Sequence, residues 1–243
     1  MKGCRRGCRR GCRRGFSPEA SLLSVIALLA TSCTTTPQAS PASDWQPLFN
    51  GQSTQGWHNV AKPTLDPRWQ AIDGALVLTE AGGGDIISEH GYADFEFEVD
   101  WQVDAGGNSG LFYRAVDAEP IWHRAVEFQL LDDRAAEDRF DPSHRAGAVY
   151  DLVVPQNAVL RPQGQYNHAR VVACGPRVEH WLNGVQVAAY DLDSANWQQR
   201  VAASKFAGQP DFAKARSGHI GFQDHGNGVR LKNIRLRPLT ACR

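Results

Sequence analysis

The 243-residue sequence has no hydrophobic run long enough to cross a membrane and no excess of charge of either sign. The apolar stretch at residues 22–30 would rise only about 14 Å as a helix, less than half of a bilayer's hydrocarbon core. Lys and Arg total 26, as do Asp and Glu, but seven of the basic residues and one acid lie in the first 32 positions. The remainder carries a net charge of −6, which argues against a nucleic-acid-binding protein.

Several catalytic and cofactor motifs are also missing. The sequence contains no GxSxG, no HExxH, no CxxC and no strand–GxGxxG–helix unit, so it lacks the usual signals of serine hydrolases, zinc proteases, zinc ribbons and dinucleotide-binding enzymes. Downstream of the N-terminal repeat the only cysteines are Cys33, Cys174 and Cys242. In an oxidising compartment Cys174 and Cys242 could pair, and a buried free thiol at Cys174 is the alternative.

The N-terminus has the pattern of an export signal. A basic Cys-Arg-Arg-Gly repeat is followed by the short apolar stretch and by small residues up to Cys33. Residues 29–33, Leu-Ala-Thr-Ser-Cys, resemble a bacterial lipobox, in which Cys33 would become the lipidated first residue. We therefore expect a signal peptide at 1–32, a flexible Thr/Pro/Ser/Ala tether at 33–43 and one domain at 44–240. The protein would be exported and lipid-anchored to the membrane in the cell envelope, on the periplasmic or outer side; an ordinary cleaved signal is the alternative.

The domain shows a hydrophobic period of two rather than 3.6. Residues 95–104, Phe-Glu-Phe-Glu-Val-Asp-Trp-Gln-Val-Asp, alternate strictly and predict a half-buried antiparallel strand. Asn183-Gly184 between two further alternating runs predicts a hairpin, and a shift of alternation at Lys232-Asn233 predicts a bulge. Helical signal is confined to residues 193–203. Other predicted strands are 75–79, 85–88, 109–116, 125–131, 148–153, 169–174, 178–182, 185–190, 219–223 and 229–236, which together indicate an all-β sandwich or barrel.

One strand combines polar groups suited to chemistry. In residues 125–133 the alternation places Glu127 and Gln129 on one face and Val126, Phe128 and Leu130 on the other. A carboxylate beside an amide could bind sugar hydroxyls or move a proton, although a solvent-exposed strand face explains the same pattern. The E-x-Q-x-x-D spacing ending at Asp132 resembles the E-x-D-x-x-E motif of laminarinase-type glycosidases, with two of its three acidic positions changed.

Aromatic and histidine residues offer further candidates. Trp122, Trp181 and Trp197 could stack on sugar rings or belong to the core. His180 is in register with apolar residues, which favours a near-core position. His144 and His225 lie in polar, glycine-adjacent loops, where functional residues are common.

Taken in order, several blocks of the sequence closely resemble the 3-keto-disaccharide hydrolase domain, a concanavalin-like jelly roll of two antiparallel sheets. The resemblance covers about residues 45–239. A block that usually reads Gly-Glu-Trp-Asn is Gly-Gln-Tyr-Asn here, which removes a carboxylate at position 165. The matching blocks are LFNG at 48–51, GW at 56–57, GNSGLFYR at 107–114, EFQLLD at 127–132, HRAGAVY at 144–150, GQYN at 164–167, HWLNG at 180–184, SKF at 204–206 and GHIGFQDHG at 218–226.

The resemblance implies hydrolysis or lysis of glycosidic bonds in 3-keto-glycosides. A ketone at C3 acidifies the C2 proton, so that a base can form an enolate and the C1 substituent can leave. On that basis we expect Glu127 or His144 as the base, Arg114 and Lys205 as enolate stabilisers, and sugar contacts from Gln129, Asp132, Trp181, Gln223, Asp224 and His225.

The sequence leaves two other functions open: a retaining glycosidase that uses Glu127 and Asp132, and a non-catalytic carbohydrate-binding module. It also leaves the cofactor open. No cofactor is required by any motif. A divalent metal ion is a candidate, because Asp132, Glu127 and His144 or His225 could supply oxygen and nitrogen ligands.

Overall fold

The computed structural model of the protein describes residues 44–242. The signal peptide, the tether and Cys33 predicted from the sequence lie outside these residues. Within them, strands dominate, and a single α-helix, α1 (Ala195–Ala202), is accompanied by three short 3₁₀ helices. No described helix combines the length and the apolar character needed to cross a bilayer.

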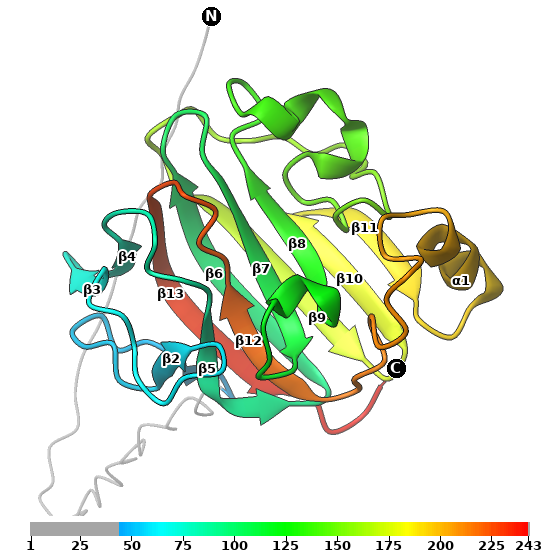
Figure 1. The fold of residues 1–243 in the computed structure, drawn as a ribbon, viewed down its shortest axis with the longest axis horizontal. Helices are drawn as coiled ribbons and strands as arrows, with labels where there is room; N and C mark the ends of the chain where they lie inside the picture. Colours follow the sequence, from blue (N-terminus) through cyan, green and yellow to red (C-terminus); the bar gives the residue numbers. More distant parts are fainter. Residues whose placement is uncertain (1–43, 243) are drawn as a thin grey trace, which may run out of the picture. The chain divides into compact units, whose positions relative to one another are not determined.

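Two antiparallel sheets stack face to face, which confirms the predicted all-β sandwich (Figure 1). The larger sheet has the order β11-β10-β9-β6-β13-β4-β3, with β1 added beside β13, and the smaller one the order β2-β5-β12-β7-β8. The strands of the larger sheet are β1 (Gln46–Pro47), β3 (Trp69–Ile72), β4 (Ala75–Leu78), β6 (Phe95–Val103), β9 (Asn167–Cys174), β10 (Arg177–Leu182), β11 (Val185–Asp191) and β13 (Val229–Pro238). Those of the smaller sheet are β2 (Trp57–Asn59), β5 (Ile86–Tyr92), β7 (Asn108–Ala115), β8 (Val126–Leu131) and β12 (Gly218–Phe222).

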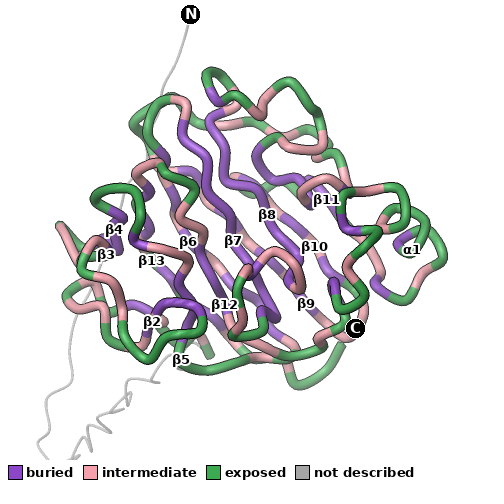
Figure 2. Tube along the Cα trace, viewed as in Figure 1, coloured by how far each residue is buried: buried purple, intermediate pink, exposed green. Residues whose placement is uncertain are grey.

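Alternation along the strands builds the core between the sheets. In β6 the apolar residues of the predicted pattern, from Phe95 to Val103, are buried, as the period of two requires. Phe128 of β8 and Phe222 of β12 meet them from the smaller sheet. Figure 2 shows the strand centres buried and the connecting loops mostly exposed.

The outer face of the smaller sheet carries a second, smaller apolar cluster. Because side chains alternate, Ile87 of β5 and Phe112 of β7 point away from the core to which Ile86 and Leu111 belong. Ile121, from the 3₁₀ helix η1 (Ile121–His123), covers them. Strands β7 and β8 are therefore buried on both faces, and the predicted solvent-exposed face of β8 is absent.

Local turn signals are confirmed. Asn183 and Gly184 both have positive φ, 50° and 85°, and join β10 to β11. The register between β13 and β6 shifts between Lys232 and Arg235, at the predicted bulge. Helix α1 lies within the predicted helical segment, with the Ser194 hydroxyl accepting a hydrogen bond from the Trp197 amide at its start.

One expected strand is absent. Residues 148–153 form turns, because the segment pairs with the edge of β8 only through an isolated bridge between Val149 and Phe128 and then turns back on itself. The short strands β1, β2 and β3 were not predicted, because a run of two to four residues is too short to show a period.

The open question about the cysteines is settled by a disulfide between Cys174 and Cys242.

Candidate active site

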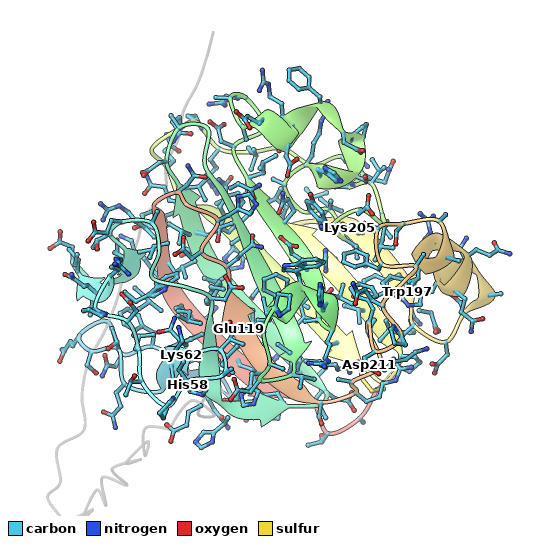
Figure 3. The ribbon with its side chains drawn as sticks, viewed as in Figure 1. His58, Lys62, Glu119, Trp197, Lys205 and Asp211 are labelled. Carbon is cyan, nitrogen blue, oxygen red and sulfur yellow. A yellow bond between two sulfur atoms is a disulfide. The ribbon has the colours of Figure 1, made fainter. Side chains whose placement is uncertain are left out.

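A polar cavity of about 240 Å³ opens where loops cover one half of the smaller sheet. Its walls come from elements far apart in the sequence: the start of β7, the start of β8, the segment after β12, η1, and the 3₁₀ helix η2 (Glu137–Phe140) with the loops beyond it. Lys205, labelled in Figure 3, arrives on the segment between α1 and β12. The lining residues are Asn108, Trp122, Glu127, Asp138, Tyr150, Lys205, Gln223 and His225.

Glu127 carries the most strongly perturbed carboxylate of this cavity. Its side chain is 7% exposed, and among residues 44–242 no group donates a hydrogen bond to it or forms a salt bridge with it. Burial raises the pKa of Glu127 to about 8, against a lowering by Lys205, with smaller raising contributions from Asp85 and Asp138. A carboxylate with a raised pKa that faces a cavity is a strong base once it is ionised.

Gly110 makes room for this carboxylate. Strand β7 pairs with β8 so that Gly110 lies opposite Gln129 and Phe112 opposite Glu127. A Cβ atom at position 110 would lie 2.8 Å from Cδ of Glu127 and would collide with its Oε1. The Glu127 side chain therefore lies diagonally across β7, a path that only glycine leaves open.

Lys205 supplies the positive charge of the cavity. Its Nζ is 4.0 Å from the ring centroid of Tyr150 and 5.2 Å from that of Trp122. Its backbone amide donates a 2.7 Å hydrogen bond to Oδ2 of Asp151. Partial burial lowers the pKa of Lys205, and the attraction of Glu127 opposes this shift.

Asp138 lines the cavity next to Tyr150 and Asn108. One of its oxygens accepts hydrogen bonds from Tyr150 Oη at 3.3 Å and Asn108 Nδ2 at 3.2 Å. Burial, followed by the negative charge of Asp138, raises the pKa of Tyr150, so the phenol stays protonated. Asp138 is thus held by its neighbours, whereas Glu127 is not.

His144 does not line the cavity but stands directly behind it. Its ring stacks on Tyr150 with centroids 4.2 Å apart, in the 3₁₀ helix η3 (Pro142–His144). Nδ1 lies 3.5 Å from Asp138 Oδ1, and Nε2 lies 3.4 Å from Asp151 Oδ1. His144 is therefore one residue removed from the cavity: its ring nitrogens face Asp138, which lines the cavity, and Asp151, which does not. Its expected role as a base stays a prediction.

Arg114 does not lie with Glu127, contrary to expectation. It is 4% exposed, and its guanidinium donates hydrogen bonds to three acceptors near the C-terminal end of β7. The acceptors are Ala93 O at 2.8 Å, Gly175 O at 2.9 Å and Asp94 Oδ1 at 3.0 Å. Arg114 therefore ties loops together, and Lys205 remains as the cation of the cavity.

Three of the expected sugar contacts also lie elsewhere. The carboxylate of Asp132 accepts the backbone amides of Gly106 and Arg134, and that of Asp224 accepts those of Gly82, Gly84 and Gly226. Both therefore hold turns in place. Trp181 is only partly buried; it alternates with buried His180 on β10 of the larger sheet, donates to Glu179 Oε2 and stacks on Arg170.

The remaining predictions fall close to the cavity or in the core. Gln223 and His225 line the cavity, as expected. Gln129 is fully buried on the same strand face as Glu127, and neither atom of its amide has a hydrogen-bond partner among residues 44–242. His180 is fully buried 3.1 Å from Gly147 O, with its pKa lowered to about 4 by burial, and Trp197 is core; both confirm the simpler interpretation.

The described residues contain no group of three His, Cys, Asp or Glu side chains arranged to hold a metal ion. Asp132, one of the proposed ligands, is directed away to the Gly106 turn. The metal therefore remains a sequence-based hypothesis.

Sequence reasoning missed Asp138, and it did not assign Asn108 or Tyr150 a role. Asp138 belongs to a run of charged residues without any periodic signal, so nothing local marks it. Asn108 and Tyr150 lie in blocks that match the family, as Glu127 does. That shared membership is the sequence signal that could have marked them as site residues. For Trp122 the sequence allows either a core position or a sugar-binding one, and in the structure it lines the cavity.

A family model and a curated relative identify the family, and solved structures share the fold. A family model described as a 3-keto-alpha-glucoside-1,2-lyase-like domain matches residues 44–237. A Bacteroides thetaiotaomicron protein named 3-keto-disaccharide hydrolase is 32% identical over 227 residues, covering 79% of this chain and 77% of that protein. A crystal structure of a candidate glycosyl hydrolase from Parabacteroides distasonis is 29% identical, with a TM-score of 0.75 over 80% of this chain and 94% of that one. A second from the same organism is 26% identical, with a TM-score of 0.62 over 80% and 99%.

Proposed function

Because the chain belongs to the family of 3-keto-alpha-glucoside-1,2-lyase-like domains, we propose that it is a hydrolase acting on glycosidic bonds, and that its substrates are 3-keto-glycosides. The observation that carries the proposal is Glu127: a buried carboxylate without a protein partner, facing a lysine across a cavity. The similarity to a named 3-keto-disaccharide hydrolase and to candidate glycosyl hydrolases supports the same class of reaction.

The chemistry requires one base and one positive charge. Glu127 removes the C2 proton, and the electron pair moves through C2 and C3 onto the C3 oxygen, where Lys205 stabilises it. The enolate then expels the C1 oxygen, whose proton comes from His225, the exposed histidine of the cavity. Water adds to C1 and a proton returns to C2, which completes hydrolysis.

The cavity suits this reaction better than direct displacement. A retaining glycosidase needs two free carboxylates about 5–5.5 Å apart. The expected second one, Asp132, is bonded to the Gly106 and Arg134 amides, and Asp138 accepts from Tyr150 and Asn108. The size of the cavity, about 240 Å³, lies below the usual 300–1,000 Å³ of ligand pockets. It suits one sugar ring, so a second ring would extend through the opening.

The test is incubation of the purified domain with trehalose and with 3-keto-trehalose, followed by quantification of the released sugars. Cleavage of the keto sugar alone is expected, with deuterium from solvent appearing at C2. The variant Glu127→Gln keeps the shape but cannot accept a proton, and it should lose about 10²-fold or more in turnover. The exposed Glu137 of η2, changed to Gln, is the matched control. Cleavage of plain trehalose would refute the proposal, and binding without turnover would indicate a carbohydrate-binding module.

We also propose that the mature protein is exported and held to the membrane by a lipid on Cys33. The N-terminal sequence pattern supports this proposal. The disulfide Cys174–Cys242 agrees with it, because disulfides persist in oxidising compartments outside the cytosol.

A further inference from the structure

The amine of Lys205 lies among three aromatic rings. Its Nζ is 4.0 Å from the ring centroid of Tyr150, and 5.2 Å from the centroids of both Trp122 and Phe206. Among residues 44–242, no carboxylate forms a salt bridge with this amine, although the charges of Glu127, Asp151 and Asp138 favour its protonated form. Partial burial outweighs them and lowers the pKa of Lys205, so the neutral amine is more accessible than that of a fully solvated lysine.

The segment that carries Lys205 is nevertheless held firmly. The backbone amide of Lys205 donates to Asp151 Oδ2 at 2.7 Å, and the next amide, that of Phe206, donates to Ser204 Oγ at 3.1 Å. Phe206 itself is buried and stacks on Phe212. The backbone is thus fixed, while the amine is left free of protein hydrogen bonds at an exposed position of the cavity.

We propose that Lys205 forms a covalent iminium with the carbonyl carbon of the substrate, so that the lysine is a nucleophile and not only a charge. This inference rests on the proposed function, since it requires a ketone in the substrate. An iminium draws electrons from the neighbouring carbon more strongly than a ketone does, and a partly desolvated lysine is a residue that can form one. Glu127, in the same cavity, is then the base for the acidified C2 proton.

The steps balance without any further reactant. Neutral Lys205 adds to C3, one proton is taken up from solvent, the C3 oxygen leaves as water, and an iminium remains. Glu127 takes the C2 proton, giving an enamine; the nitrogen electron pair then expels the C1 oxygen, which takes a proton from His225, and a conjugated iminium remains. One water adds to C1 and returns a proton to His225, the proton on Glu127 returns to C2, and a second water hydrolyses the iminium and releases the proton taken up in the first step. One water is released and two are consumed, so the net reaction is hydrolysis.

Substitutions separate a covalent role from a purely electrostatic one. Lys205→Arg keeps the positive charge but cannot form an iminium, whereas Lys205→Met removes both functions. A covalent role predicts that both variants lose about 10²-fold or more in turnover. A purely electrostatic role predicts that the arginine variant stays within about tenfold of the wild type, and this result would overturn the inference. Lys214→Arg, at an exposed lysine outside the cavity, is the matched control.

Reductive trapping supplies the direct readout. The full domain is incubated with methyl 3-keto-α-glucoside and sodium cyanoborohydride, which reduces an iminium to a stable amine, and the adduct is located by peptide mass spectrometry. Methyl α-glucoside, which lacks the ketone, is the negative control. The expected result is one adduct, at Lys205, absent from Lys205→Arg and unchanged in Lys214→Arg.

The outcomes also separate this inference from the proposed function. Cleavage of 3-keto-trehalose without any adduct at Lys205 would overturn the iminium and leave the proposed function intact. An adduct at Lys205 without cleavage would support the iminium and overturn the hydrolase. Adducts spread over exposed lysines such as Lys214 would show non-specific modification and would also overturn the inference.

Discussion

Replacing Glu127 with glutamine should make the protein more stable as well as inactive. In the unfolded chain this carboxylate ionises near its ordinary pKa of 4.5, whereas in the folded protein burial raises the pKa to about 8. The unfolded state therefore loses this proton first as pH rises, and the free energy of unfolding falls between about pH 4.5 and pH 8. Gln cannot ionise, so the variant escapes that loss.

The size of the effect follows from the difference in pKa. A shift from 4.5 to about 8 corresponds to roughly 5 kcal/mol at full ionisation, of which roughly 3 kcal/mol is already present at pH 7. Below about pH 4 the two proteins should differ only by the exchange of a neutral acid for an amide. For a domain of this size, about 2–4 °C of melting temperature corresponds to each kcal/mol, so the advantage of the variant should grow by roughly 10 °C or more from pH 4 to pH 9.

The assay is thermal or urea unfolding of the wild type and Glu127→Gln across that pH range. Glu137→Gln removes an exposed carboxylate of η2, one position before Asp138, and should unfold in parallel with the wild type. Parallel curves for Glu127→Gln and the wild type would refute the reasoning, because they would mean that Glu127 is solvated or neutralised in the folded state. A stabilised, inactive variant would show that stability is sacrificed at this residue for function.

Four further results are expected. Turnover should rise with pH through about 8, because only ionised Glu127 can accept the C2 proton; a flat pH–rate profile from 6 to 9 would contradict this. Gly110→Ala should displace the Glu127 carboxylate and lower turnover at least about tenfold with an unchanged circular dichroism spectrum, whereas normal turnover would show that the carboxylate can move without loss. Gly184→Val should cost about 1–3 kcal/mol of stability, read from the urea midpoint, because φ is 85°, and should leave KM unchanged. Cys33→Ser should shift the protein from the membrane to the soluble or unprocessed fraction, and unaltered partitioning would exclude the lipid anchor.

Local patterns were sufficient for much of the fold. The alternation in residues 95–104 identified β6 because a strand with one face in the core must repeat every two residues. The Asn183-Gly184 turn was recognisable because few residue pairs accept positive φ at both positions. Residues 148–153 show the limit of such reasoning: an apolar run looks like a strand, but the tertiary structure gives it only an isolated bridge to the edge of β8.

Local patterns could not decide which polar residues share a site. Arg114 and Lys205 were equivalent candidates in the sequence. In the structure the Arg114 guanidinium donates hydrogen bonds to Ala93, Asp94 and Gly175, whereas Lys205 lines the cavity. Asp132 and Asp224, which looked like sugar contacts, instead accept the backbone amides of turns. A carboxylate in a loop has the same local sequence for either use, because its partner is chosen by chain segments far away.

The sequence by itself determined the all-β class, the face of β8 that carries Glu127 and Gln129, and the family, since these depend on residue order and on a period of two. Only the tertiary structure decided that this face is buried, that Gly110 leaves a path for the Glu127 side chain, and that Lys205 meets it from a segment 78 positions later in the chain. The physical reason is that a pKa near 8 arises from desolvation, and desolvation depends on how loops distant in sequence close over a strand.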